Sequence, residues 1–142
     1  MLVSKELNAG FWALRLAFGL GPLIAGLDKF TNILVNWQKY LSPVAERILP
    51  VNVSTFMHIV GVIEIIVGLG VLFGATRTFG YITMLWLFAI AANLISGGTY
   101  YDIAVRDILL GCGAYALARV TEARQSVVIV TDEYRDDFRT AA

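Results

Sequence analysis

The chain has 142 residues, of which 58% are hydrophobic and 15% charged, and its 11 basic and 11 acidic side chains leave no net formal charge. Soluble domains average about 45–50% apolar and about 25% charged residues, so one small soluble core could not bury this much apolar surface. The balanced charge also excludes a strongly basic surface for nucleic acid. With a mean hydropathy of +0.71, the composition indicates an integral membrane protein in contact with the lipid bilayer.

Four segments are apolar over the roughly 20 residues that a helix needs to cross a bilayer. They cover residues 10–27, 56–73, 78–95 and 103–120. No segment outside them is apolar enough to build a separate soluble domain. We therefore predict an all-α fold, a polytopic membrane four-helix bundle over residues 1–120, followed by a polar cytoplasmic tail over residues 121–142.

Three of the spans carry a stripe in which polar residues alternate with glycines at helical spacing. Small residues on such a stripe let helix backbones approach closely in lipid. The glycines expected at helix contacts are Gly19 and Gly26 in the first span, Gly61 and Gly68 in the second, and Gly111 in the fourth.

The loop between the first two spans, residues 28–55, is too polar to cross a membrane but keeps apolar residues near helical spacing. This pattern predicts an interfacial helical segment with Trp37 and Tyr40 at the level of the lipid headgroups. Pro43 and Pro50 should break the segment into pieces that cap the outer end of the bundle.

Glu64 lies in the middle of the most apolar span, where a charge costs about 3 kcal/mol or more. The side chain should therefore face the bundle interior and find a partner. Arg15 is the expected partner, because it enters from the cytoplasmic side about five residues, or roughly 8 Å, short of the bilayer midplane. Alternatively, Glu64 is protonated because burial disfavours its charged form.

A second polar cluster is expected in the outer half of the bundle, where the span ends bring four side chains to a similar depth. Its members are Lys29, His58, Asn93 and Asp107. Lys29 and Asp107 could form an ion pair, with Asp107 also favoured near a helix N-terminus. Two interpretations stay open: polar contacts that hold four helices in register, or a pocket for a small molecule such as a quinone.

The chain has few of the residue types that bind metals or haem or act in catalysis. The chain has one histidine and one cysteine, Cys112, whereas structural zinc sites and buried haems take several such ligands. No nucleophile, base and orienting group stand at a recognisable spacing. We therefore assign no catalytic residues, no metal site and no intrinsic cofactor, with quinone as the cofactor left open, and leave open whether the chain belongs to an enzyme.

Lys and Arg near the span ends predict the orientation. The loop between the third and fourth spans has neither residue type, which favours both termini in the cytoplasm of a multi-pass protein of the inner (plasma) membrane.

Three segments carry motifs that occur together in one protein family: RLAFGLGPLIAGLDKF in the first span, GVIEIIVGLGVLFGATRTFG in the second and RDILLG in the fourth. They are similar to R-L-x-x-G…G-x-x-K, G-x-x-E-x-x-x-G-x-x-L…G…T-R and D-x-x-L-x-G. In these motifs the chain resembles the DoxX family of small four-helix membrane proteins. The resemblance covers residues 11–118 and implies a bacterial protein associated with oxidoreductases or redox-stress complexes.

On this basis we expect an accessory or assembly subunit of a larger membrane complex, of a redox or respiratory kind, with a protein partner. A quinone-binding subunit of an oxidoreductase is the alternative, and a small-solute transporter the second alternative; self-association is left open. The tail after residue 120 is expected to be a flexible, mixed-charge end, or a docking segment in which residues 126–130 add a strand to a partner.

Overall fold

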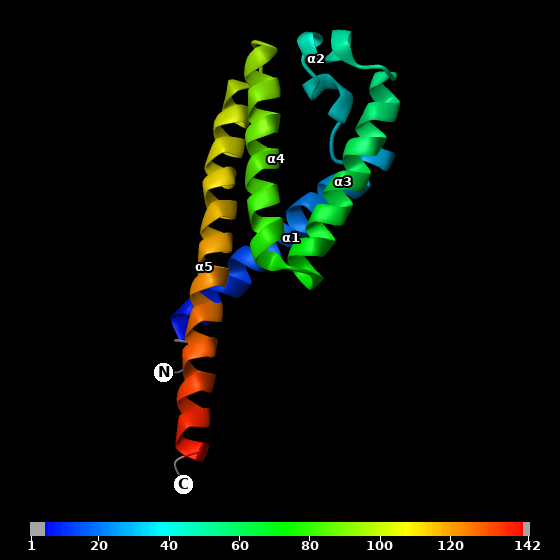
Figure 1. Cartoon of the computed structure of the whole chain (residues 1–142). Coiled ribbons are helices and arrows are strands. Elements are labelled where there is room, and N and C mark those ends of the chain that lie inside the picture. Colours follow the sequence, from blue (N-terminus) through cyan, green and yellow to red (C-terminus); the bar gives the residue numbers. More distant parts are fainter. Residues whose placement is uncertain (1–4, 141–142) are drawn as a thin grey trace.

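The computed structural model describes the backbone of residues 5–140 and the side chains of residues 5–127, and every regular element in this part of the chain is helical. The four long helices are α1 (Lys5–Thr31), α3 (Val53–Phe73), α4 (Thr76–Ser96) and α5 (Tyr101–Thr140). Two short elements, the 3-10 helix η1 (Trp37–Tyr40) and α2 (Pro43–Ile48), lie between α1 and α3 (Figure 1).

Three of these helices, α1, α3 and α4, are long and apolar enough to cross a membrane. The all-helical fold expected from the sequence is confirmed. Four spans were predicted, and three of them are confirmed as long and apolar enough to cross a membrane. The fourth, in α5, is less apolar and carries both Arg106 and Asp107 in its second turn.

The long helices pack as two pairs. α1 packs mainly on α3 and α4 mainly on α5, with fewer contacts between the pairs. α4 and α5 run side by side in opposite directions, and α1 crosses them at an angle (Figure 1). A cluster of buried side chains joins the pairs near the N-terminal half of α1: Phe11, Phe18, Val71, Ala114 and Leu117.

Local sequence signals explain the short elements between α1 and α3. Ser42 caps α2 by accepting a hydrogen bond from the backbone N–H of Ala45, and Pro43 stands at the first helical position. Asn52 caps α3 in the same way, accepting from the N–H of Thr55. The first loop thus contains two short helices, and the second begins at Pro43. Proline has no backbone N–H and a fixed φ, so it can start a helix but cannot continue one.

The last segment is helical, which the sequence analysis did not predict. Residues 121–140 continue α5 as helix, and the C-terminal part of α5 projects beyond the other helices (Figure 1). Residues 126–130 are helical in the chain alone, and the strand that would add to a partner's sheet stays a prediction. The helix continues here because neither glycine nor proline follows Gly113 to break it. Residues 1–4 of the predicted bundle and residues 141–142 of the predicted tail lie outside the described residues.

Candidate functional site

A buried ion pair lies between α1 and α3. Lys29 Nζ is 2.5 Å from Glu64 Oε2, and the two side chains are only 4% and 6% exposed. Lys29 is near the end of α1, and Glu64 is at the middle of α3. The carboxylate that the sequence places in the most apolar span therefore has a cationic partner.

Two tryptophans complete the surroundings of this pair. The Lys29 ammonium lies 3.7 Å from the centroid of the Trp37 ring, which places it in cation–π contact with η1. Trp86 of α4 donates its indole N–H to Glu64 Oε1 at 3.4 Å. The pair thus connects four elements, α1, η1, α3 and α4.

Glycines bring the two helices close enough for this contact. A Cβ on Gly26 would lie 2.6 Å from the carbonyl oxygen of Gly61, and a Cβ on Gly61 would lie 2.8 Å from that of Gly26. The two backbones therefore touch one turn before Lys29 and one turn before Glu64. Gly19 and Gly68 form a second contact of this kind, in which a Cβ on Gly68 would lie 2.6 Å from the oxygen of Gly19.

The predicted helix contact at Gly111 involves an aromatic side chain. A Cβ on this residue would lie 2.5 Å from the ring of Phe88, so the Phe88 side chain packs where α5 has no Cβ. Gly111 therefore lies at the contact between α5 and α4.

Arg15 does not pair with Glu64, and that expectation is wrong. Its guanidinium donates to the carbonyl oxygens of Val71, at 3.0 Å, and Leu72, at 2.8 Å. These carbonyls belong to the last turn of α3, where helical partners are missing and the helix dipole attracts a cation. The prediction counted depth from the span ends, but the glycine contacts set the register of α1 against α3 and bring Lys29, not Arg15, to Glu64.

The expected outer cluster does not form as one group. Asp107 is buried, and its partner is the adjacent Arg106, whose Nε and Nη2 each lie 2.9 Å from Asp107 Oδ1. His58 is exposed and stacks on Phe30 with ring centroids 5.0 Å apart. Lys29 is thus the one member of the cluster that reaches Glu64.

Asn93 serves a different contact. Its side-chain oxygen accepts from the backbone N–H of Ser42 at 3.1 Å, and its amide nitrogen donates to the carbonyl of Tyr40 at 2.8 Å. Asn93 therefore fastens the first loop to the end of α4.

Asp28 has a role that the sequence analysis missed. Its carboxylate accepts the backbone N–H groups of Ile33 at 2.8 Å and Leu34 at 3.0 Å, and the indole N–H of Trp37 at 2.8 Å. The sequence did hold a signal for this role. An acidic residue near a helix C-terminus is disfavoured by the helix dipole, so its presence there indicates a specific contact. Asp28 organises the first loop so that Trp37 lies over Lys29.

Asp28→Asn should therefore loosen the start of the first loop. Hydrogen bonds to a charged group contribute about 1.5–3 kcal/mol, so amide exchange at Ile33 and Leu34 should accelerate about ten- to hundredfold. Hydrogen-exchange mass spectrometry measures this directly. Asp102→Asn, at an exposed position in the first turn of α5, is the matched control and should leave these amides protected; equal exchange in both variants would contradict the assigned role.

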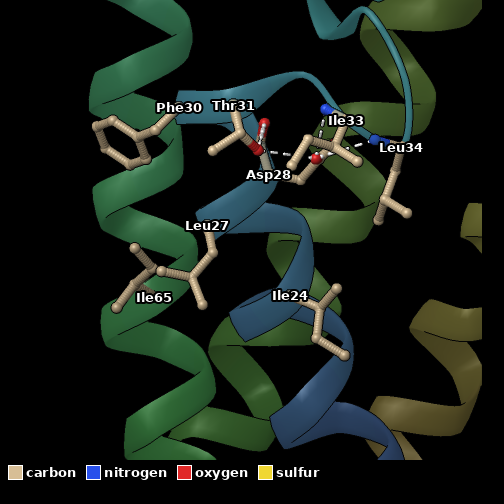
Figure 2. A pocket seen from close by; sticks show the side chains of 8 residues that line it. All are labelled: Ile24, Leu27, Asp28, Phe30, Thr31, Ile33, Leu34 and Ile65. Atoms are coloured by element: carbon tan, nitrogen blue, oxygen red, sulfur yellow. Dashed lines mark hydrogen bonds between the residues drawn. The ribbon is translucent and has the colours of Figure 1, made fainter.

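An apolar hollow of about 530 Å³ lies beside the ion pair, over the end of α1 (Figure 2). Its apolar lining residues are Ile24, Leu27, Phe30, Ile33, Leu34 and Ile65. Asp28 and Thr31 supply its polar edge, and the Asp28 carboxylate is turned toward the backbone of Ile33 and Leu34 (Figure 2). The hollow can take an apolar group such as a hydrocarbon chain.

Within the described residues, no three His, Cys, Asp or Glu side chains gather as a metal site would require. No family model, curated protein or solved structure matches this chain.

Proposed function

We propose that the chain is a DoxX-like, four-span membrane protein that acts as an accessory or assembly subunit of a larger redox or respiratory membrane complex. The fourth span would be the first half of α5. Residues 101–120 extend about 30 Å at 1.5 Å per residue, the thickness of a bilayer's hydrocarbon core. α5 runs alongside α4, which is apolar enough to span, so the two helices would cross the membrane together.

The observation that carries the proposed role is the contact set of the Lys29–Glu64 pair. The ammonium group is shared between Glu64 and the Trp37 ring, and Glu64 also accepts from Trp86. The strongest polar interactions at the centre of the molecule thus hold its own helices together. In the proposed role, this internal contact set would hold the helices in a fixed arrangement whose outer surface a partner can bind.

The positions of the cations support the proposed orientation in a bacterial inner membrane. Arg15 contacts the end of α3, Arg77 lies in the first turn of α4, and Arg119 and Arg124 lie on either side of the middle of α5. Arg124 donates to Asn8 near the start of α1 at 2.8 Å. The other end has Lys29, Lys39, Arg47 and Arg106, but the loop between α4 and α5 has no Lys or Arg, so we place the first end and both termini in the cytoplasm.

The apolar hollow favours the alternative, a quinone-binding subunit of an oxidoreductase. The hollow is shallow and open, and most of its apolar lining residues are exposed, so it would cover one side of a bound apolar chain. A prenyl tail would fill the apolar side of the hollow. Asp28 at its polar edge accepts from the indole N–H of Trp37, whose ring lies over the Lys29 ammonium of the ion pair.

Purification from native membranes tests the two functions against each other. The tagged full chain is extracted in a gentle detergent, and the eluate is analysed by protein and lipid mass spectrometry. We expect a stoichiometric protein partner and no quinone. Bound quinone without a stable partner would overturn the accessory role in favour of the alternative.

Variants sharpen this comparison. For an accessory subunit, Glu64→Gln should lower recovery of the partner together with the abundance of the chain. For a quinone site, the double variant Lys29→Met with Glu64→Gln, which buries no uncompensated charge, should remove quinone while the helices stay folded. Glu46→Gln, at an exposed position in α2, is the control and should change neither quantity.

A further inference from the structure

Two arginines at the proposed cytoplasmic end share one carboxylate. Arg77 Nε lies 2.8 Å from Glu122 Oε1, and Arg119 Nη1 contacts Glu122 Oε2. Among the side chains that the structure describes, Glu122 is the one carboxylate in ion-pair contact with either guanidinium. The group therefore carries one net positive charge.

Both guanidinium groups remain accessible. The side chains of Arg77 and Arg119 are 56% and 58% exposed, whereas that of Glu122 is 19% exposed. Each guanidinium has five N–H donors in a planar fork; the contacts with Glu122 engage one nitrogen of each, and Arg119 also donates to Tyr81. The remaining donors suit the oxygens of a phosphate group.

The surface next to this group changes from charged to amphipathic to apolar along both helices. On α4, Arg77, Tyr81 and Leu85 fall within about 80° of one another. On α5, Arg119, Tyr115 and Ile108 fall within about 40°. The rings of Tyr81 and Tyr115 lie 6.2 Å apart, so the two faces meet. Tyr81 also donates its hydroxyl to Glu122 at 3.1 Å.

This order matches that of a phospholipid in one leaflet. Tyrosine rings are enriched at the headgroup level, and exposed apolar side chains continue from them toward the centre of the span: Leu85, Phe88, Ile108 and Leu109. We infer that the outer face of α4 and α5 binds an anionic phospholipid, with its phosphate at Arg77 and Arg119 and its acyl chains along these apolar residues. The inference rests on the proposal that both helices span the membrane.

Cys112 provides a local probe of this face. It is the one cysteine of the chain and is exposed. It lies seven residues from Arg119, about 10 Å along the helix toward the acyl chains. A fluorophore on Cys112 in vesicles is quenched by lipids with brominated acyl chains that contact it. Comparing brominated phosphatidylglycerol with brominated phosphatidylcholine yields the local preference for the anionic lipid.

Each exposed cation near an anionic lipid contributes about a fivefold preference, so the wild type, with one net charge, should prefer phosphatidylglycerol about fivefold. Arg77→Gln with Arg119→Gln should abolish this preference. Glu122→Gln should raise it, because the net charge of the group increases. Lys39→Gln with Arg47→Gln changes two exposed cations in the first loop and should leave the preference unchanged.

Four outcomes would overturn the inference. Equal quenching by both lipids, or a preference that survives loss of both arginines, would exclude this lipid site while leaving the spanning helices intact. Loss of the preference when inorganic phosphate replaces chloride at equal ionic strength would identify a site for free phosphate. Absence of quenching by either lipid would show that this face lies outside the bilayer, and the proposed fourth span would fail with it.

Discussion

Glu64→Gln should lower the free energy of unfolding by about 3–5 kcal/mol, the usual loss when one partner of a buried ion pair is removed. The Lys29 ammonium would then stay buried with an amide and the Trp37 ring as its partners. Lys29→Met should cost a similar amount, because it leaves the Glu64 carboxylate without its cation. Reversible unfolding in mixed detergent micelles measures both losses.

The double variant, Lys29→Met with Glu64→Gln, separates a specific pair from two independent effects. It buries no uncompensated charge, so it should unfold with a smaller loss than the sum of the two single losses. A strictly additive result would contradict the ion pair.

Arg15→Gln is the matched comparison for this cycle. Arg15 bonds to the carbonyls of Val71 and Leu72, so its loss should add to that of Glu64→Gln without coupling. Coupling between Arg15 and Glu64 as large as that between Lys29 and Glu64 would show that the pairing expected from depth along the spans was correct after all.

Gly26→Ala should destabilise the chain by about 1–3 kcal/mol, the typical cost of inserting a methyl group into a tight contact. Its Cβ would lie 2.6 Å from the carbonyl oxygen of Gly61, and a backbone atom cannot turn aside as a flexible side chain can. The helices must separate, which also lengthens the Lys29–Glu64 contact. The expected loss in the free energy of unfolding is therefore measurable in the same micelles.

Gly10→Ala is the control on the same helix. Nothing lies within 4 Å of its Cβ position, so the higher helix propensity of alanine should stabilise the chain by up to about 1 kcal/mol. The two substitutions need not change the free energy of unfolding by equal amounts. A stabilising effect of Gly26→Ala would contradict the close approach of α1 and α3.

The amino-acid sequence by itself determined the helical class and most helix boundaries. Apolar runs of membrane-spanning length, prolines in the first loop and caps such as Asn52 act locally, over a few residues, so they can be read without knowing the tertiary arrangement. The same local signals predicted that Glu64 needs a partner, because the cost of a charge in an apolar span does not depend on which helix supplies the cation.

Only the tertiary structure decided which cation that is. Arg15 and Lys29 lie on the same stripe of α1, so periodicity cannot choose between them. The choice depends on the register of α1 against α3, which the contact between Gly26 and Gly61 sets through backbone atoms on separate helices. For the same reason Asn93 received its role from the docking of the first loop on α4, and His58 from the packing of α3 on α1, long-range arrangements that no local pattern encodes.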